Sequence, residues 1–446
     1  MKIVIVGAGE VGFHIAKQLT EEGKDVVLIE KDPETAKYAS NTLDCLVIKG
    51  EGTHMEVLKD AGTGSADIFV AATTSDEVNL ISCFVVASEF QVPVKIARVR
   101  SVEYTQRRAF STNFSGVDYL VNPDREAAWE IAQTVEQGAT STITVFHRTD
   151  IQMRDYYVDE GSYFTDKTVK DIRMGLKEYL LITSVARDGE LQIPNGDFEV
   201  KDGDSLHIVA HKSTFQKIHR KIGYKTDKLR KIAIVGGTPI GMAVAELLVA
   251  KGRSIVIIDK NYEHCKFIAD ELPEATVINA DISDHELYAE EGLYKMDAVV
   301  GATQNEELNI LSGVYAKTLG VKRVVAVVEK TSYLTIAGSI GIDSTVSPKF
   351  SVINTILKFI RKGRVRSVYS VFDGQAEAID INIGENSRLT GKPIKDLHLP
   401  PDCLLAAVNR GRKSIIPDGN LELRPGDNAI FFAKRHSIPE LERLLA

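Results

Sequence analysis

Short apolar runs alternate with amphipathic stretches over roughly the first 140 residues of the chain. The runs at 2–6 and 25–29 are rich in β-branched residues, which indicates buried strands. Between them Val11, Ile15 and Leu19 recur at helical spacing. The same pattern predicts four further strands, at 45–48, 67–72, 94–97 and 118–121. Strands that alternate with helices are typical of a parallel, doubly wound α/β sheet.

A glycine-rich turn, residues 7–12, joins the first strand to the first helix. Gly7 permits a tight turn, Gly9 leaves room for a pyrophosphate, and Gly12 lets helix and strand pack closely. Amide groups at the helix N-terminus would then face the phosphates. Glu30 ends the second strand, where a carboxylate accepts hydrogen bonds from a ribose diol and repels a 2′-phosphate. We therefore expect NAD(H), or another adenine nucleotide with a free ribose.

The pattern of hydrophobic and polar residues then changes, and the whole pattern is later repeated. From about residue 141, short alternating strands separated by Asp-Gly and Asn-Gly turns predict a small α+β domain. The first pattern begins again at Lys231, with Gly7 matched by Gly236 and Glu30 by Asp259, both at an offset of 229 residues. The small domain also recurs, so the order is A-B-A-B, a tandem duplication. The expected domains are 1–138, 139–226, 229–363 and 364–446, two Rossmann-like doubly wound sheets each followed by a small α+β domain.

The second glycine turn, residues 236–241, departs from the first. Thr238 replaces the middle glycine and brings a Cβ toward the phosphate path, and Pro239 removes one N–H from the turn. By an offset of 230, Val328 stands where the first unit has Arg98, so a charge that would neutralise phosphate is missing. Two interpretations stay open: a weaker site for a ligand poor in phosphate, or a fold retained for symmetry.

Composition narrows the possible classes of function. The chain has 446 residues with a formal net charge of −8, which argues against nucleic-acid binding. No apolar run reaches the roughly 18–20 residues that span a bilayer. The four cysteines are scattered without metal-ligand spacing, as expected for reduced thiols in a cytosolic protein.

The sequence contains no convincing candidate residues for catalysis or for metal binding. Tyr-x-x-x-Lys spacing occurs at Tyr163–Lys167 and at Tyr262–Lys266, but neither pair follows the fourth strand, where a dehydrogenase would need it. His207 and His211 could share a strand face, yet no third ligand is evident, so we expect no metal site. Acidic residues at the strand tips are expected to cap the following helices.

The duplicated order and the tip sequence at 72–79, Ala-Thr-Thr-Ser-Asp-Glu-Val-Asn, resemble the TrkA family of tandem RCK (KTN) proteins. The stretch at 50–53 resembles that family's Gly-Asp-Gly/Ala-Thr, with Glu for Asp. The resemblance covers essentially the whole chain. Together with the motifs, it implies a first set of nucleotide contacts at Gly7, Ala8, Gly9, Glu10, Val11, Gly12, Glu30, Gly52, Thr73, Thr74 and Arg98. The corresponding second set is Gly236, Gly237, Thr238, Pro239, Ile240, Gly241, Asp259, Asp281 and Thr303.

The resemblance also implies a function. Family members bind NAD(H), and several bind ATP or ADP; they form rings, here expected to be tetramers, beneath a Trk-type membrane potassium channel subunit and gate it. The expected protein is thus a non-enzymatic regulator, cytoplasmic and peripheral on the inner face of the cell membrane. Two alternatives remain open, an NAD-dependent oxidoreductase and a nucleotide sensor of a different potassium channel or antiporter.

Overall fold

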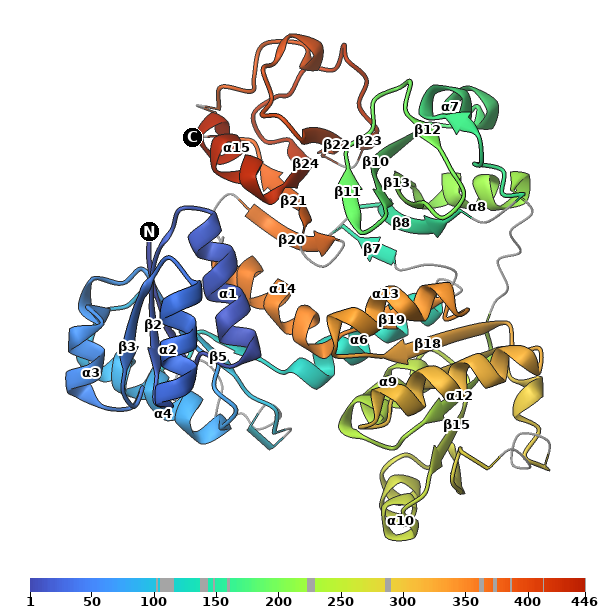
Figure 1. The fold of residues 1–446 in the computed structure, drawn as a ribbon, viewed down its shortest axis with the longest axis horizontal. Helices are drawn as coiled ribbons and strands as arrows, with labels where there is room; N and C mark the ends of the chain where they lie inside the picture. Colours follow the sequence, from blue (N-terminus) through green and yellow to red (C-terminus); the bar gives the residue numbers. More distant parts are fainter. Residues whose placement is uncertain are drawn as a thin grey trace.

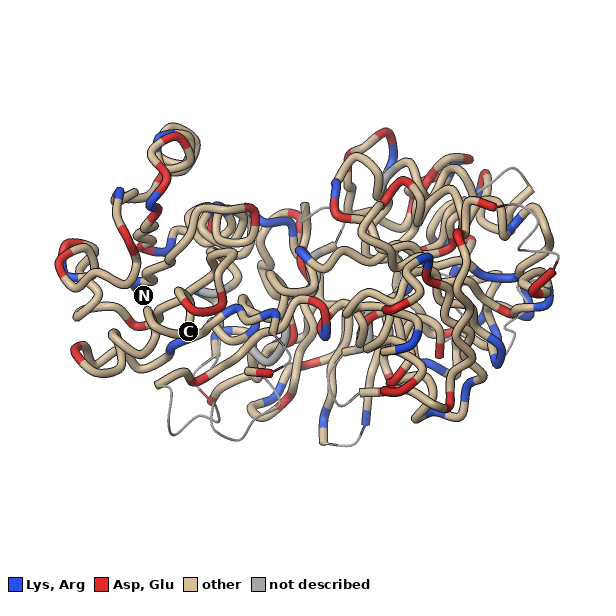
Figure 2. The backbone as a smooth tube through the Cα atoms, turned by 90° about the horizontal axis from the view of Figure 1, so that it is seen from below, with Lys and Arg blue, Asp and Glu red and all other residues tan. Residues whose placement is uncertain are grey.

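Four domains are visible in the computed structural model, two with parallel sheets and two smaller ones (Figure 1). The structure describes residues 1–101, 103–104, 116–136, 143–146, 149–158, 161–222, 229–284, 290–360, 365–371, 375–385, 387–411 and 413–445. Within these residues no helix is long and apolar enough to cross a membrane. Basic and acidic residues alternate along the backbone, and neither sign dominates the face seen in Figure 2.

The first half begins with a six-stranded parallel sheet in the order β3-β2-β1-β4-β5-β6. Its strands are β1 (Lys2–Val6), β2 (Asp25–Glu30), β3 (Leu46–Lys49), β4 (Ile68–Ala71), β5 (Val94–Arg98) and β6 (Tyr119–Val121). Each lies within one residue of its predicted bounds. The chain runs outward from β1 to β2 and β3, then returns to β4 on the other side of β1. The ends of β1 and β4 therefore form the switch point at which such sheets bind ligands.

The helices of this domain are α1 (Glu10–Glu21), α2 (Pro33–Thr42), α3 (Met55–Asp60) and α4 (Asp76–Glu89). The hydrophobic pattern did not predict α2. This helix buries only Ala36 and Ala39, so it has almost no apolar periodicity to detect. The local signal was in its cap, because the side chain of Asp32 accepts a hydrogen bond from the Thr35 amide at 2.8 Å and Pro33 occupies the first turn.

The second half repeats this architecture. A parallel sheet runs in the order β16-β15-β14-β17-β18-β19. The strands are β14 (Lys231–Val235), β15 (Ser254–Asp259), β16 (Thr276–Asn279), β17 (Ala298–Gly301), β18 (Arg323–Val327) and β19 (Ser344–Val346), and the helices are α9 (Pro239–Val249), α10 (Tyr262–Glu271), α12 (Glu306–Thr318) and α13 (Thr331–Ser339). The predicted duplication of the doubly wound sheet is confirmed.

The two halves exchange the helices that leave their sheets. Helix α6 (Pro123–Glu136) follows β6, but its buried side chains, such as Ile131, lie in the core of the second sheet beside α9. Helix α14 (Pro348–Ile360) follows β19, but its Ile356 lies in the core of the first sheet beside α1. The two helices also contact each other, and Figure 1 shows α14 next to α1. Each parallel-sheet domain is thus completed by the other half.

The small domains are built on five-stranded antiparallel sheets. The first has the order β11-β10-β13-β8-β7, from β7 (Ile143–Val145), β8 (Ile151–Tyr157), β10 (Leu180–Arg187), β11 (Glu190–Gln192) and β13 (Ser205–His211), with the pair β9 (Lys167–Thr168) and β12 (Glu199–Val200) and helices α7 (Val169–Leu176) and α8 (Lys212–Lys221). The second has the order β20-β21-β24-β22-β23, from β20 (Val365–Val371), β21 (Ala376–Asn382), β22 (Cys403–Arg410), β23 (Lys413–Ile415) and β24 (Asn428–Lys434), with α15 (Ile438–Leu445). The expected small α+β domains are therefore present.

Each small domain contains a Gly-Asp turn with a structural role, at residues 203–204 in the first and 426–427 in the second. Asp204 is fully buried and receives two hydrogen bonds of 2.7 Å from the Arg187 guanidinium. Asp427 receives the same pair from Arg410, at 2.9 and 2.8 Å. Such two-pronged contacts satisfy both carboxylate oxygens. The two small domains also share one apolar core, to which Met153 and Phe432 contribute.

Candidate nucleotide-binding site

The first glycine turn has the shape that a close phosphate approach needs. Gly7 has a φ of +97°, which favours glycine, and a Cβ on Gly12 would overlap the carbonyl oxygen of Gly7. At Gly9 an added Cβ would meet nothing within 4 Å, so this position faces open space. Gly9 also caps α1 without any side-chain hydrogen bond, so no side chain of the turn occupies the N-terminal amides of the helix. The turn therefore leaves an open, partly positive surface at the edge of the sheet.

Glu30, at the end of β2, holds the turn from the other side. Its carboxylate accepts hydrogen bonds from the Ala8 amide at 2.6 Å and the Asp32 amide at 2.9 Å. This structural role was not anticipated from the sequence, which indicated only contact with a ribose. Each carboxylate oxygen has a second lone pair, so the two roles are compatible.

The tip of β4 is fixed by a buried amide. Asn79 is fully buried, and its side-chain oxygen accepts hydrogen bonds from the Thr73 amide at 2.9 Å and the Thr73 hydroxyl at 2.7 Å. Its amide group donates to the Arg98 carbonyl at 2.8 Å, and the Arg98 guanidinium donates to the Thr73 carbonyl, also at 2.8 Å. Burial lowers the pKa of Arg98 from its usual value. The network therefore locks the ends of β4 and β5 together and presents Arg98 at the crevice.

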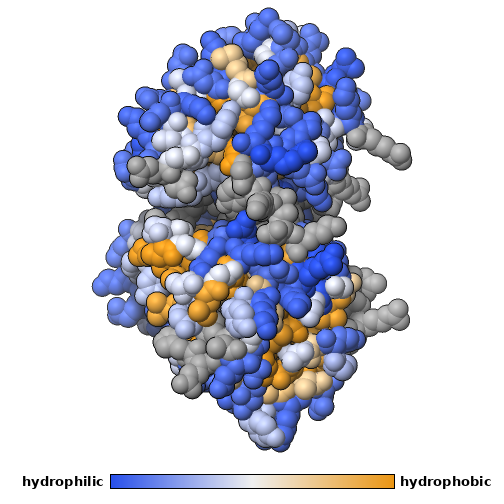
Figure 3. Space-filling model, turned by 90° about the vertical axis from the view of Figure 1, so that its right-hand side faces the viewer, coloured by the Kyte–Doolittle hydropathy of each residue, from blue (hydrophilic) through white to orange (hydrophobic). Residues whose placement is uncertain are grey.

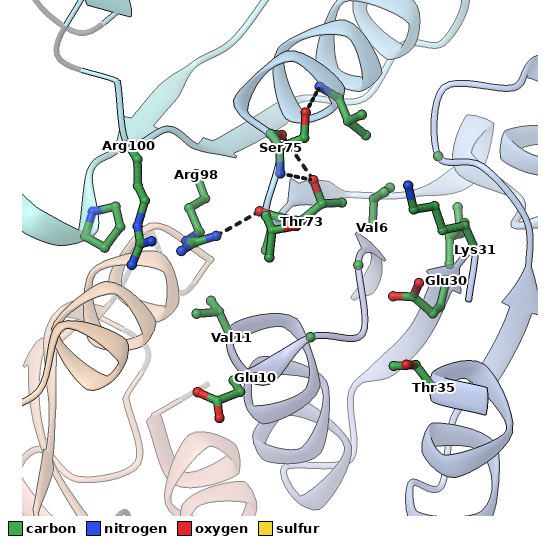
Figure 4. A pocket seen from close by; sticks show the side chains of 18 of the residues that line it. Val6, Glu10, Val11, Glu30, Lys31, Thr35, Thr73, Ser75, Arg98 and Arg100 are labelled. Atoms are coloured by element: carbon green, nitrogen blue, oxygen red, sulfur yellow. Dashed lines mark hydrogen bonds between the residues drawn. The ribbon is translucent and has the colours of Figure 1, made fainter. Parts of the chain in front are cut away.

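A cavity of about 480 Å³ opens at this switch point. Figure 4 shows Arg98 and Arg100 at one end and Glu30, Lys31 and Thr35 at the other, with the N-terminus of α1 between them. The predicted residues that line it are Gly7, Gly9, Glu10, Val11, Glu30, Gly52, Thr73, Thr74 and Arg98. Of the first predicted set, Ala8 and Gly12 do not line the cavity: Ala8 is buried, and Gly12 packs against Gly7. The volume suits a nucleotide-sized ligand.

Several lining residues were missed by sequence reasoning. Lys31 and Arg100 are close in sequence to predicted contacts, and their charge was the available signal. Glu329, Pro348 and Lys349 also line the cavity although they belong to the second half of the chain. No sequence pattern links them to the first turn: Pro348 and Lys349 begin the exchanged helix α14, and Glu329 follows β18 of the second sheet.

The second crevice keeps the framework of the first, but the Thr238 side chain crosses it. Gly236 has a φ of +101°, and Asp259 accepts hydrogen bonds from the Gly237 amide at 2.9 Å and the Asn261 amide at 2.8 Å, as Glu30 does in the first unit. The Thr238 hydroxyl donates to the Ala302 carbonyl at 2.6 Å and accepts a hydrogen bond from the Gly241 amide at 3.2 Å. This side chain ties the turn to the tip of β17, across the path that is open at Gly9.

Two side chains lie close to the acidic strand tip of the second crevice, His264 and Ile268. His264 Nδ1 lies 3.4 Å from Asp259 Oδ2, and a Cβ on Gly237 would overlap the side chain of Ile268. The other predicted residues of this set have structural partners. Pro239 and Ile240 form the first turn of α9, Asp281 accepts from the Ser283 amide and hydroxyl, and Thr303 donates to Asn309. Both interpretations of the second unit, a site for a ligand poor in phosphate and a fold retained for symmetry, fit this geometry.

One sequence match was wrong by a residue. The Asn309 side-chain amide donates to the Val327 carbonyl at 2.9 Å, just as Asn79 donates to Arg98. Val327, not Val328, therefore stands at the position of Arg98, because the offset changes from 230 to 229 between β17 and β18. The inference that this position carries no charge is unaffected. With the same offset of 229, Glu329 is the residue of the second unit that corresponds to Arg100 of the first.

These features define a class of protein: a tandem pair of dinucleotide-type sheets with small α+β domains, in which the first crevice holds a cavity and the second is crossed by Thr238. Residues 3–123 and 232–348 match the TrkA-N domain, and residues 153–223 and 379–446 match the TrkA-C domain. The chain belongs to the TrkA family, as its resemblance indicated.

Relatives over the full length have the same family name. The Trk system potassium uptake protein TrkA homolog of Archaeoglobus fulgidus is 32% identical over 100% of both chains. The TrkA homolog 1 of Methanosarcina mazei is 32% identical over 99% of both chains, and TrkA of Azorhizobium caulinodans is 30% identical over 100% of this chain and 98% of its own.

Solved structures share the fold at lower identity. The GsuK RCK domain superposes with a TM-score of 0.58 at 19% identity, covering 100% of this chain and 94% of its own. The GsuK channel bound to NAD gives 0.57 at 20% identity, covering 100% of this chain and 78% of its own. These similarities establish the tandem RCK fold.

Proposed function

We propose that the chain is a nucleotide-binding regulatory subunit of a Trk-type potassium-uptake system, with NAD(H), ATP or ADP as the ligand of the first crevice. The observation that carries the proposal is the convergence of an open glycine turn, an acidic strand tip and Arg98 on one cavity of about 480 Å³. Full-length relatives named as Trk potassium uptake proteins support the transport role. Structures of GsuK bound to NAD and to ADP support the choice of ligands.

The arrangement of the cavity suggests how the ligand lies. A pyrophosphate placed over Gly9 meets the α1 amides and no side chain of the turn. The ribose then reaches Glu30, whose charge disfavours a 2′-phosphate, so NAD(H) is preferred over its phosphorylated form. The remaining part of the ligand points toward Arg98.

The proposed protein is a regulator and not an enzyme. Among the residues that the structure describes, no His, Cys or Tyr side chain lines the cavity. Hydride transfer to a substrate requires a positioned acid or base beside the nicotinamide, and these three are common choices for it.

Helix α1 offers a mechanical link from the ligand to the second small domain. Its N-terminus lines the cavity, while near its C-terminus the Gln18 side-chain amide donates to the buried Glu377 carboxylate of β21. Glu21 also forms an ion pair with Arg435 at 3.1 Å. A nucleotide that prefers one position of α1 shifts this contact, and only such differential affinity can do work on a channel gate. A coupling of about 1–3 kcal/mol is typical of allosteric proteins.

Exposed apolar side chains support the proposed ring. Ile81 and Phe84 on α4 are more than half exposed, and Leu311, the duplicate of Ile81 on α12, is 65% exposed. Figure 3 shows hydrophobic side chains gathered on the lower part of one face. Such patches mark protein interfaces. We propose a homo-oligomeric ring, a tetramer, on the cytoplasmic face of a membrane potassium channel subunit that supplies the pore.

The test is equilibrium binding of NADH, NAD, ATP and ADP to the purified chain, with NADP as a control for Glu30. Micromolar-range binding that differs among the four, and co-purification with a Trk-type membrane subunit, would support the proposal. Binding by none of the four would refute nucleotide regulation. Co-purification with a different potassium channel or antiporter would refute the Trk assignment, and substrate-dependent oxidation of NADH would refute the regulatory one.

A further inference from the structure

The two exchanged helices contact each other through two carboxylates and two hydroxyls. The Thr355 hydroxyl donates to the Glu126 carboxylate at 2.9 Å, and the Ser351 hydroxyl donates to the Glu130 carboxylate at 2.6 Å. Both carboxylates belong to α6 and both hydroxyls to α14. In the part of the chain that the structure describes, neither carboxylate forms an ion pair. Helix α6 thus brings two carboxylates without a cation to its contact with α14.

This placement of Glu126 and Glu130 is unfavourable for α6 itself. The two residues are one turn apart, and like charges at such spacing repel each other. Burial raises the pKa of Glu130, and the Glu126 charge raises it further. Hydroxyl donors satisfy the hydrogen bonds of a carboxylate but do not neutralise its charge. A pair of acids kept at a helix contact against the local rule indicates a role other than stabilising the helix.

The contact has the form of a two-fold interface. Helix α14 repeats α6 at an offset of 225 residues, so Ser351 is the duplicate of Glu126 and Thr355 is the duplicate of Glu130. Position 126 therefore meets the duplicate of position 130, and position 130 meets the duplicate of position 126. Such reciprocal contacts are the pattern of a symmetric interface, which two identical helices can form. The backbone arrangement alone would thus accept two copies of α6, or two copies of α14, from different chains.

The charges exclude one of these pairs. In a pair of α6 helices, Glu126 of each copy would meet Glu130 of the other, so four carboxylates would come together without a cation. Removing charges from water without an opposite charge nearby is costly. A pair of α14 helices would bring only hydroxyls together, so the charges do not exclude it.

Side-chain size distinguishes the helices at their other contact, with the sheets. Their buried apolar positions correspond, but α6 has the smaller side chain at every position except one, where both have isoleucine. The residues are Ala127, Ala128, Ile131, Ala132 and Val135 on α6, and Val352, Ile353, Ile356, Leu357 and Ile360 on α14. The helices that face them compensate, since α9 brings Leu247 and Val249 to the second core where α1 has Gln18 and Thr20. Side chains of α14 would therefore overfill the second core, and those of α6 would leave cavities in the first.

We propose that α6 and α14 are complementary binding faces, each of which accepts the opposite half of the chain and rejects a second copy of its own half. Glu126 and Glu130 are the specificity-determining residues of the helix contact, and side-chain size determines which sheet each helix enters. Without this divergence the duplicated halves would be interchangeable, and pairing of like halves could join chains into open assemblies. With it, the link between the halves favours pairing within one chain, because that pairing is intramolecular.

The experiment presents α6 with a copy of its own acidic residues inside the full chain and measures thermal unfolding without nucleotide. Ser351→Glu/Thr355→Glu makes all four contact positions acidic, and Ser351→Gln/Thr355→Gln, with side chains of the same size and no charge, is the matched control. We expect the Tm of the Glu variant to lie about 3–10 °C below that of the Gln variant. Adding Glu126→Ser and Glu130→Thr to the Glu variant moves the acidic pair to α14 and should recover most of this difference. If the all-acidic variant does not fold, a folded fourfold variant is the same supporting result.

The size matching is tested in the same assay. Ala127→Val/Ala132→Leu places side chains of α14 in the second core and should lower the Tm, also by about 3–10 °C. Equal Tm values for the Glu and Gln variants, or no recovery in the fourfold variant, would overturn the role of Glu126 and Glu130. A Tm of Ala127→Val/Ala132→Leu at or above that of the unmodified chain would overturn the size matching. No nucleotide enters these measurements, so they leave the proposed function intact in either case.

Discussion

The duplication provides an internal control for the role of Glu30. Glu30 and Asp259 end equivalent strands, and each carboxylate accepts two hydrogen bonds from backbone amides, at 2.6 and 2.9 Å for Glu30 and at 2.9 and 2.8 Å for Asp259. Glu30→Ala and Asp259→Ala therefore remove the same pair of backbone contacts, and Asp259→Ala also removes the contact with His264. They differ in the crevice they face, since the first is open at Gly9 and the second is crossed by Thr238.

The effect of these variants on stability and their effect on nucleotide binding have different expected magnitudes. Loss of two hydrogen bonds to a charged group lowers the free energy of unfolding by about 2–3 kcal/mol in either variant, after allowance for partial exposure. Loss of two ribose hydroxyl contacts costs about 3 kcal/mol of binding energy, which is roughly a 100-fold increase in Kd. We expect this increase for Glu30→Ala alone.

The assay combines urea unfolding without ligand and calorimetric titration with NADH or ADP. Similar losses of stability are expected in both variants, with one nucleotide bound per chain in the unmodified protein and in Asp259→Ala. Equal losses of affinity in the two variants, or two nucleotides bound per unmodified chain, would show that the second crevice binds the ligand as well and that the effect of Thr238 was misjudged.

Three other predictions follow from the packing. Gly12→Ala should lower the free energy of unfolding by about 1–3 kcal/mol because the added Cβ overlaps the backbone of the turn. Gly9→Ala changes an extended residue that faces open space, so this variant should keep its Tm and lose nucleotide affinity. A loss of stability in Gly9→Ala and a loss of affinity alone in Gly12→Ala would contradict the assigned roles. Ile131→Ala should cost about 2–5 kcal/mol and reduce hydrogen-exchange protection in β14 of the second sheet, and loss confined to the first sheet would argue against the helix exchange. Burial lowers the pKa of His219 to about 4, so the folded state binds a proton at this residue less readily than the unfolded state does. The contribution of His219 to stability is therefore complete above about pH 6.5, and urea titrations should show the free energy of unfolding falling by about 3 kcal/mol toward pH 4. His219→Gln should remove that fall.

Local pattern was sufficient for the six strands of the first sheet and for the duplication. Six strands of the first sheet lie within one residue of the expected bounds, because each is a short, buried apolar run between turn residues. The glycine turn, Glu30 and the β4 tip could be placed at one crevice because parallel strands end at the same edge of a sheet. Helix α2 was missed because it buries only two alanines.

The tertiary structure decided how the halves combine. Helices α6 and α14 are duplicates with similar apolar faces, so periodicity shows that each is buried but not against which sheet. Only the packing shows that each enters the core of the other half, and this places Lys349 at the first cavity. The sequence likewise showed that Thr238 departs from the motif, while its hydrogen bond across the crevice to Ala302 depends on a carbonyl 64 residues away. The sequence by itself determined the strands, the helices and the turns, because these depend on local hydrophobic periodicity and on turn residues. It could not determine which of two helices with similar apolar faces packs on which sheet, because that choice depends on contacts between residues far apart in the chain.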